Sequence, residues 1–431
     1  MDTQASRVIS HHAAHHDAGR CRICAAPLKH SFADLGMSPL CESFLQADQL
    51  DCMEPYFPLH AYVCEKCFLV QLKEYVSPSN IFTEYAYFSS YSTSWVAHAK
   101  SYCETIKHRL GLNSSSLVVE LASNDGYLLQ HFIPLGVPVL GIEPAANVAK
   151  AAIKRGVPTR VEFFGETYAG VLAGEDKMAD LIIGNNVLAQ VPDINDFVAG
   201  IARLLKPEGV VTLEFPHIER LMAENQFDTI YHEHFSYFSL GAIETLASRH
   251  RLKVFDVEEL PTHGGSLRVY LAHAASTHQL TQRVAAVIGR EVSHGLRSIE
   301  AYTRFQDNVR QTKRRLLSFL ISAKTAAKTI CGYGAPGKGN TLLNYCGIGT
   351  DFIDFTVDRN PYKHGRFTPG MHIPIQPVEA IAAAKPDYIF ILPWNLKNEI
   401  VQQMNFVKDW GCKFIVPIPE VAVIDPKEVR S

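Results

Sequence analysis

A stretch of twelve residues, FDTIYHEHFSYF at positions 227–238, carries a dense supply of groups that can move protons. Tyr231, Glu233 and His234 lie within four residues of one another, and a phenol, a carboxylate and an imidazole all serve as acids or bases in enzymes. On an extended chain His232 and His234 share one face, whereas a helical turn pairs Tyr231 with His234. Two other interpretations stay open. The first is a metal site, although HEH lacks the four-residue separation of helical ligands, and the second is an aromatic core with hydrogen-bonded histidines.

A second candidate site lies in residues 117–143, where two apolar runs end in the acids Glu120 and Glu143. The predicted order is strand, turn, helix and strand, which brings both acids to the carboxyl ends of parallel strands, where doubly wound sheets bind ligands. The turn after Glu120 consists of Ala122, Ser123, Asn124, Asp125 and Gly126. Two acids beside a closely approaching backbone favour a ligand with a ribose diol and a cationic tail. S-adenosylmethionine (SAM) has both.

The turn at residues 122–126 has two competing interpretations, an ordinary turn that only shapes the chain and a dinucleotide site. The usual phosphate-cradling glycines are missing, and two carboxylates would repel a pyrophosphate. We therefore expect SAM, with the turn at its aminoacyl end and Glu143 at its ribose hydroxyls. Core-capping amides are the alternative for Asn186 and Gln190. The remaining expected cofactor contacts are Tyr85, Pro144, Asn185, Asn186 and Gln190.

The stretch IFTEYAYFSSY, at positions 81–91, is unusually rich in phenols and hydroxyls for a linker. It precedes a predicted helix whose apolar face includes Trp95 and Tyr102. We expect Tyr85 to reach over the cofactor and Tyr87 to reach the substrate. Packing between domains is the alternative.

Four cysteines form two CxxC knuckles, CRIC from Cys21 to Cys24 and CEKC from Cys64 to Cys67. Two residues between the thiolates of each pair let both turn toward one ion, so tetrahedral zinc is expected. Four thiolates fill its coordination shell, which makes the zinc structural. The alternatives are four buried thiols or a redox pair, and no βαβ pattern surrounds either knuckle to support the latter.

A glycine-rich turn near the C-terminus, from Gly332 to Asn340, follows an apolar run and opens a predicted helix. It satisfies GxGxxG, but a lone match is weak, and Pro336 and Lys338 suit a bound phosphate better than a closely packed dinucleotide. Asp358 and Trp394 end the next predicted strands at the same edge. The expected substrate contacts there are Gly334, Lys338, Gly339, Asn340, Asp358, Arg359, Trp394 and Asn395.

Three predicted α/β blocks position these groups. We expect a disordered tail at residues 1–19, a zinc-binding domain at 20–79, a central Rossmann-like domain at 80–273 and a second Rossmann-like domain at 274–431. The predicted elements are strands at residues 161–164, 179–184, 209–215, 267–271, 351–357 and 389–394, and helices at 127–132, 285–324 and 341–345.

Composition sets the broad class. The 431 residues are 47% hydrophobic and 20% charged, with a formal net charge of −3, which is typical of a soluble globular protein. A net charge this small and negative does not indicate binding to nucleic acid or to an anionic membrane. No apolar run approaches the length of a membrane span. Ten cysteines fit a reducing compartment with one metal site. We expect a cytoplasmic monomer.

Thirteen sequence motifs along the chain resemble those of the sugar C-3-methyltransferases of deoxysugar biosynthesis. The motifs are CRIC, PLCESF, CEKC, YFSSYSTSW, ELASNDGYLL, GIEPAANVA, NNVLAQVPD, EFPH, QFDTIYHEHFSYFS, THGGSLRV, GYGAPGKGNTLLN, TVDRNPYKHG and ILPWNLKNEI. They occur in order and cover essentially everything beyond the tail. The resemblance implies zinc, SAM and a nucleotide-linked (TDP) 4-keto-6-deoxyhexose, with the nucleotide on the C-terminal domain.

The same resemblance implies roles for single residues. His234 matches the family's candidate base, Tyr231 and Glu233 match its neighbours, and the knuckle cysteines match its zinc ligands. One departure is Gln190, which stands where many members carry a histidine, so that more of the proton transfer falls on His234. A base of near-neutral pKa would remove the C3 proton while Tyr231 stabilises the C4 oxyanion. A sensor that binds both ligands without turnover, and a weak dehydrogenase, are the rival functions.

Overall fold

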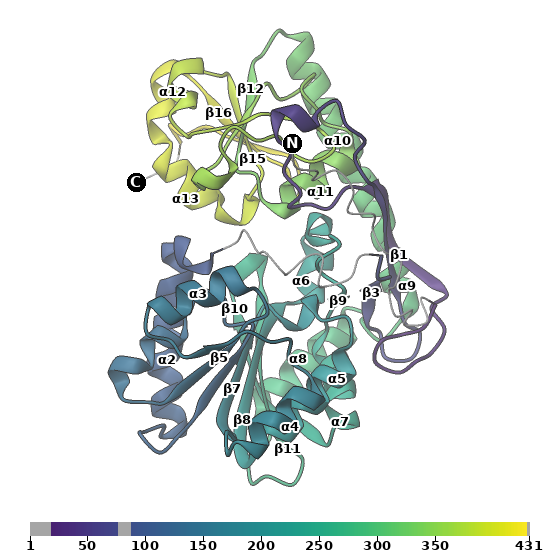
Figure 1. The fold of residues 1–431 in the computed structure, drawn as a ribbon. Helices are drawn as coiled ribbons and strands as arrows, with labels where there is room; N and C mark the ends of the chain where they lie inside the picture. The colour runs from purple at the N-terminus through teal and green to yellow at the C-terminus, as the bar shows by residue number, and fades with distance from the viewer. Residues whose placement is uncertain (1–18, 76–87, 429–431) are drawn as a thin grey trace.

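The chain folds into three β-sheets with helices around them, and the computed structural model describes residues 19–75 and 88–428 (Figure 1). Tyr85 and Tyr87 therefore lie outside the described residues, as does almost all of the predicted tail. The expected fold class is confirmed: four clustered cysteines near the N-terminus, a central Rossmann-like α/β sheet and a second α/β unit. The exact domain boundaries stay predictions.

The central sheet has seven strands in the order β10-β11-β8-β7-β4-β5-β6. The strands β8, β7, β4, β5 and β6 are parallel, whereas β11 pairs antiparallel with β8 on one side and with the edge strand β10 on the other. Strand β4 is buried along its whole length, Glu120 included, as expected for a central strand of a sheet covered on both faces. Their bounds are β4 Val118–Leu121, β5 Val139–Ile142, β6 Thr159–Arg160, β7 Ala179–Asn185, β8 Leu205–Pro216, β10 Leu252–Leu260 and β11 Ser266–His273.

The N-terminal sheet is antiparallel and takes its last strand from the middle of the chain. Its order is β1-β2-β3-β9, and β9 follows His234 by two residues, within the stretch 227–238. The strands are β1 His30–Ser38, β2 Phe57–Val63, β3 Val70–Leu72 and β9 Ser236–Tyr237.

The C-terminal sheet has six strands in the order β14-β13-β12-β15-β16-β17, all parallel except β17. The strands are β12 Ile330–Tyr333, β13 Thr356–Val357, β14 Ile375–Gln376, β15 Tyr388–Ile391, β16 Lys413–Val416 and β17 Ala422–Ile424. Gly334 follows β12 with φ +87°, and a Cβ there would lie 2.6 Å from Pro393, so this close turn requires glycine.

The α-helices cover these sheets, and α10 runs along the side of the molecule between the N-terminal and C-terminal parts (Figure 1). Their bounds are α2 Thr93–Leu110, α3 Ala146–Lys154, α4 Glu166–Gly174, α5 Ile194–Leu204, α6 Ile218–Ala223, α7 Leu240–Arg249, α8 Gln282–Ser293, α9 Ile299–Thr303, α10 Phe305–Thr325, α11 Gly337–Cys346, α12 Ala380–Ala384 and α13 Lys397–Gln403.

Several predicted elements differ from those observed. The segment 127–132 forms only a 3₁₀ turn at Leu129–His131, because Pro134 follows too closely for a regular helix. The predicted helix 285–324 is three helices, and Gly295 interrupts it with a left-handed backbone at φ +81°. The predicted strand 161–164 is wrong, since β6 ends at Arg160. The strand predicted at 351–357 is only the two residues of β13.

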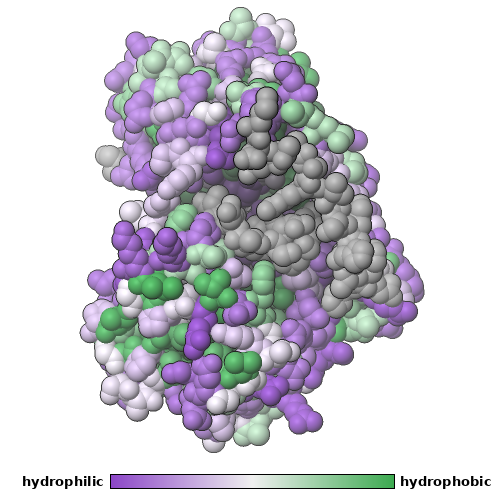
Figure 2. Space-filling model, viewed as in Figure 1, coloured by the Kyte–Doolittle hydropathy of each residue, from purple (hydrophilic) through white to green (hydrophobic). Residues whose placement is uncertain are grey.

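The hydrophobic core does not divide at the predicted domain boundaries. Cys21, Ile23 and Leu69 of the cysteine knuckles belong to the same buried cluster as Val119 and Phe215 of the central sheet. A second cluster joins the N-terminal sheet to α10 and the C-terminal sheet. On the face shown in Figure 2, hydrophobic residues gather over the central domain. Among the described residues, no helix combines the length and hydropathy needed to cross a bilayer.

Candidate active site

A cavity of about 310 Å³ opens at the carboxyl ends of β4, β5 and β7. This is the edge at which the parallel strands were expected to present a ligand site. The predicted cofactor contacts that line it are Ala122, Asn124, Glu143, Pro144, Asn185, Asn186 and Gln190. Tertiary structure thus brings together residues from three separate strand ends.

Glu143 fastens the turn after β4 to the end of β5. One carboxylate oxygen accepts the Asn124 amide at 2.8 Å and the other accepts the Ala145 amide at 2.9 Å. Burial raises the pKa of Glu143, while these two amides lower it. Each oxygen retains a further lone pair, so the carboxylate can also accept a ligand hydroxyl.

Four of the predicted cofactor residues lie outside the cavity lining and support it instead. Asp125 forms an ion pair with Arg155 at 2.7 Å and accepts the Ser90 hydroxyl at 2.5 Å. The Ser123 amide donates to the Ile142 carbonyl at 3.2 Å. Gly126 has φ +77°, and a Cβ there would lie 2.9 Å from a Val157 methyl group, so the turn requires glycine.

Glu120 is the fourth, a fully buried acid at the end of β4. Burial raises its pKa well above the ordinary value, and the charges of Glu143 and Asp125 raise it further. One of its oxygens has no hydrogen-bond partner among the described residues. The Glu120 carboxyl therefore holds its proton to higher pH than an exposed glutamate does.

The apolar wall of the cavity was not identified from sequence. Phe163 and Phe164 line it directly after β6, and Phe164 packs edge-on against Phe197 with ring centroids 5.5 Å apart. The signal was the pair of adjacent aromatic residues, which was interpreted as part of an edge strand. These rings supply an apolar face of the kind that a flat heterocycle such as adenine requires.

The charges of the lining fit SAM. Four acids face the cavity, namely Glu143, Glu162, Asp193 and Asp196, and its described lining contains no lysine, arginine or histidine. A cationic sulfonium is favoured in such a field, whereas the pyrophosphate of a dinucleotide would be repelled. The donor set therefore fits SAM, which Glu143, the turn and the aromatic wall would hold.

We predict that Glu120→Gln stabilises the ligand-free protein more at pH 8 than at pH 5.5. An unfolded chain releases the glutamate proton near its ordinary pKa, about 4.3, whereas the folded protein retains it to higher pH. Folded-state stability therefore falls as the pH rises through this window, and glutamine removes that loss. Melting curves at both pH values test this. An equal change in Tm at both would contradict it.

The candidate catalytic pair is Tyr231 and His234, which a turn at residues 232–233 brings together. The His234 Nδ1 atom lies 3.2 Å from the Thr229 carbonyl oxygen, which can only accept, so Nδ1 carries the proton. The Tyr231 hydroxyl, 3.0 Å from Nε2, then donates to the unprotonated nitrogen. This arrangement leaves Nε2 as the basic atom.

Burial, together with the charges of His263 and Lys338, lowers the pKa of His234 to about 3, although the hydrogen bond to the Thr229 carbonyl opposes this shift. The expected near-neutral pKa is therefore not found in the ligand-free protein, chiefly because the imidazole is desolvated. His263 stands in a strained backbone at φ +54°, and its role in this environment was not identified from sequence. The base form of His234 is present throughout the usual pH range of an assay.

His232 and Glu233 point to other surroundings than the Tyr231–His234 pair. The His232 Nε2 atom lies 3.2 Å from the Pro58 carbonyl, and its ring packs edge-on against Phe57. Glu233 accepts the Cys41 thiol at 3.7 Å, and burial together with the charge of Glu42 raises its pKa to about 8. The structure thus separates Glu233 from the pair, and its catalytic role stays a prediction.

A group of three residues from the C-terminal part, Lys338, Trp394 and Asn395, lies near residues 227–238, which we call the catalytic segment. The Lys338 ammonium donates to Asn395 at 2.9 Å and stands 4.7 Å from the centroid of the Trp394 ring. The Trp394 indole donates to Asp228 at 2.7 Å, and burial raises the pKa of Asp228 to about 7. Three of the predicted substrate residues are therefore grouped, and Trp394 joins this group to Asp228.

Of the remaining predicted substrate residues, Gly334 and Asp358 shape the turn after β12. Asp358 accepts the Ala335 amide at 2.8 Å with one oxygen and the Asn360 amide at 2.8 Å with the other, as Glu143 does in the central sheet. Asn340 donates to the Cys41 carbonyl at 2.5 Å. Gly339 packs on Leu392, and Arg359 pairs with Glu399 on the surface at 3.3 Å.

A second cavity, of about 470 Å³, separates the central and C-terminal parts. Trp394 and Asn395 line it from one side, and Arg220 and the Gly264–Gly265 turn line it from the other. Its position beside the Lys338 group makes it a second candidate ligand site.

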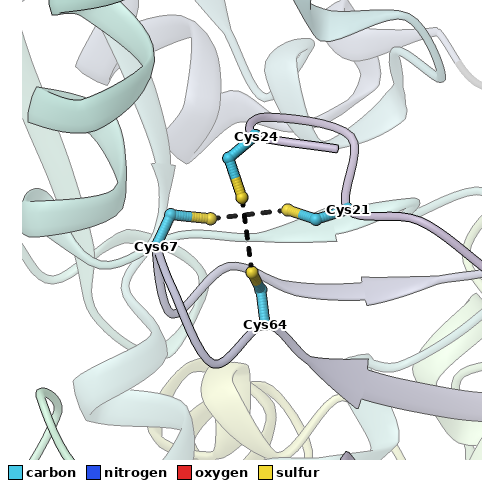
Figure 3. Close-up of side chains that lie close together, drawn as sticks. All are labelled: Cys21, Cys24, Cys64 and Cys67. Atoms are coloured by element: carbon cyan, nitrogen blue, oxygen red, sulfur yellow. Dashed lines mark hydrogen bonds between the residues drawn. The ribbon is translucent and has the colours of Figure 1, made fainter. Parts of the chain in front are cut away.

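The four knuckle cysteines converge (Figure 3). Their sulfur atoms all lie within 4.8 Å of one another, with Cys21 and Cys67 at 3.4 Å and Cys24 and Cys64 at 3.5 Å. Zinc–sulfur bonds of about 2.3 Å place tetrahedral sulfurs about 3.8 Å apart, so these thiols fit the ion. Gln71 and the Lys66 amide donate to Cys21 and Cys64 as supporting contacts.

Fold and sites together define a SAM-dependent methyltransferase with a zinc-binding domain. Three family models match consecutive parts of the chain: a zinc binding domain at residues 21–82, a methyltransferase domain at 95–256 and a C-methyltransferase C-terminal domain at 261–419. SAM and zinc are its cofactors.

The chain is 37% identical over 404 residues to the C-methyltransferase NovU of Streptomyces niveus, with 94% of this chain and 96% of that protein covered. It belongs to the C-methyltransferase family and is a SAM-dependent C-methyltransferase. The resemblance drawn from the sequence motifs is confirmed at this level.

Other relatives match over shorter parts. An O-methyltransferase of ubiquinone biosynthesis from Bartonella tribocorum is 28% identical over 95 residues, covering 22% of this chain and 38% of that protein. The solved structure of the glycopeptide N-methyltransferase MtfA with SAM is 15% identical over 41% of this chain and 94% of its own, with a TM-score of 0.33.

Proposed function

We propose that this enzyme transfers a methyl group from SAM to C3 of a nucleotide-linked 4-keto-6-deoxyhexose, with TDP as the nucleotide. The observation that carries the proposal is the Tyr231–His234 pair, whose geometry leaves an unprotonated Nε2 beside a phenol. The amide of the next residue, Phe235, donates to the Ala189 carbonyl at 2.7 Å. Ala189 precedes Gln190, which lines the cavity of about 310 Å³ that we call the donor cavity. This contact supports placing the proposed base next to the proposed methyl donor site.

The chemistry follows from carbon acidity, because a C4 ketone makes the C3 hydrogen removable. His234 Nε2 takes this proton, a contribution on the order of 10² to 10⁴ in rate. Tyr231 transfers its hydrogen bond from Nε2 to the C4 oxygen, which frees the base and stabilises the enolate in one movement. When bound, SAM supplies the electrophilic methyl group that C3 accepts. Gln190 lines the donor cavity and cannot act as a base.

The C-terminal part holds the nucleotide in this proposal. Lys338, at the first turn of α11, offers an ammonium to a phosphate, and the cavity beside Trp394 and Asn395 offers space for the nucleotide. An anionic diphosphate there would raise the pKa of His234 toward the range of an effective base, since its charge opposes that of Lys338. We further propose a cytoplasmic monomer.

The decisive experiment incubates the protein with SAM and a panel of nucleotide-linked sugars, including TDP-4-keto-6-deoxyhexoses with and without a C3 hydroxyl. The expected result is a mass gain of one methyl group at C3 for a 4-keto sugar alone. Binding of both ligands without methylation would indicate a sensor. Methylation of sugars that lack the ketone would overturn the C3 carbanion mechanism.

Lys338→Ala should raise the KM for the nucleotide sugar about tenfold or more while the Kd for SAM changes less than twofold, because the ammonium is proposed to meet only the acceptor. Lys328→Ala is the matched control, since Lys328 pairs with Asp387 on the surface of the same domain. Titration calorimetry gives the Kd and initial rates give the KM. An equal loss of SAM affinity would place Lys338 elsewhere.

A further inference from the structure

The first of the two cysteine knuckles, Cys21 to Cys24, contacts the catalytic segment directly. The contact is made by the side chain of Arg22, which lies between the two cysteines. The Arg22 Nη1 atom donates to the Leu72 carbonyl and, at 3.3 Å, to the Phe235 carbonyl. Its guanidinium also lies 5.3 Å from the centroid of the Phe235 ring. Phe235 immediately follows His234, so Arg22 holds the peptide on which the candidate base is mounted.

A second tie runs through Gln71. Its side chain accepts the Arg22 amide at 2.9 Å and donates to the Cys21 sulfur at 3.3 Å. The backbone of Gln71 pairs with Ser236 in β9, and the Leu72 amide donates to the Phe235 carbonyl at 3.0 Å. The knuckle is thus bound to β3, and β3 in turn pairs with β9, the strand that carries the end of the catalytic segment.

The other side of the knuckle is held by the central domain. The Asn195 side-chain amide donates to the Arg22 carbonyl at 2.5 Å, and its oxygen lies 2.9 Å from His250 Nε2. The knuckle therefore lies between α5 and the strand after His234, rather than standing apart as an independent folding unit.

From these contacts we propose that Arg22 is a positioning residue, which transmits the rigidity of the zinc knuckle to Phe235 and so fixes the direction of His234 Nε2. Without the guanidinium, the Phe235 carbonyl keeps only its sheet bond to Leu72, and the turn at residues 232–234 can shift. A displacement of about 1 Å in a base is enough to reduce the rate about a hundredfold. The kinetic part of this inference rests on the proposed function.

The test compares Arg22→Met, which keeps the length of the side chain but removes its donors, with Arg22→Lys and with the control Arg20→Met. Arg20 adjoins the same knuckle, is exposed and donates to the Ala25 carbonyl. We expect Arg22→Met to keep one zinc and the wild-type Kd for SAM, and to lower kcat about tenfold or more with KM changed less than threefold. Arg22→Lys should recover part of kcat, and Arg20→Met should be indistinguishable from wild type.

A readout without turnover separates this inference from the proposed function. In protein labelled with ¹³C at histidine Cε1, the His234 signal, assigned by its loss in His234→Asn, should move in Arg22→Met and stay in Arg20→Met. An unchanged His234 signal and kcat in zinc-loaded Arg22→Met would overturn the inference. If that variant loses zinc, Arg22→Gln decides, because glutamine is too short to reach the Phe235 carbonyl and carries no charge: a zinc-loaded Arg22→Gln with an unmoved signal overturns it equally. If wild type methylates no sugar, only the proposed function fails.

Discussion

Replacing His234 with asparagine should lower kcat for methyl transfer by a factor of about 10² to 10⁴, while both ligands still bind. Asparagine keeps a polar group of similar reach but has no basic nitrogen. The hydrogen bond from Nδ1 to Thr229 and that from Tyr231 to Nε2 show which atom is lost. Rapid-quench measurement of one turnover, with calorimetric Kd values for SAM and the nucleotide sugar, tests this result.

Proton exchange isolates the base from the methyl transfer. With SAM replaced by its demethylated product, wild type should wash solvent deuterium into C3 of the ketosugar, and His234→Asn should not. Tyr231→Phe is the matched comparison. It should keep part of the exchange, because it weakens stabilisation of the oxyanion and leaves Nε2 in place. Exchange by His234→Asn at the wild-type rate would move the base to another group, with Glu233 or a water held near Gln190 as the first candidates.

Removal of zinc should unfold the N-terminal part of the protein and destabilise the remainder. A Cys₄ zinc site contributes about 10–16 kcal/mol to folding in small domains, which is comparable with the whole stability of a typical protein, about 5–15 kcal/mol. Here Cys21, Cys64 and Cys67 belong to the same buried cluster as the central sheet, so the loss should spread to the SAM cavity. Cys64→Ser should therefore lower the Tm by more than ten degrees and give largely insoluble protein.

The control for Cys64→Ser is Cys52→Ser, since Cys52 is exposed and lies outside the cluster of four thiols. It should keep wild-type solubility, Tm and metal content. Gently purified wild type should hold about one zinc per chain by plasma mass spectrometry. A content below a third of an equivalent, or a Cys64→Ser protein as stable as wild type, would contradict a structural zinc site.

Local patterns in the sequence were sufficient for several strands, their following turns and the two CxxC pairs, but not for the segment 161–164. The buried run before Glu120 forms β4, the acid Glu143 ends β5, and both CxxC pairs meet at one point. The first two features, and the spacing within each CxxC pair, depend on neighbours within a few residues. The meeting of the two pairs also requires the chain between Cys24 and Cys64 to fold back on itself. The pairing of Tyr231 with His234 is local in the same way, although the sequence left the extended alternative open.

The tertiary structure alone decided what each of these groups faces. Glu120 and Glu143 are both acids at strand ends, but one is buried without a full set of partners and the other lines the donor cavity. The contacts of Lys338 with Asn395 and of Arg22 with Phe235 join residues 57 and 213 positions apart. Such contacts, and the desolvation that lowers the pKa of His234, depend on how distant segments pack, and residue type and spacing do not encode that directly.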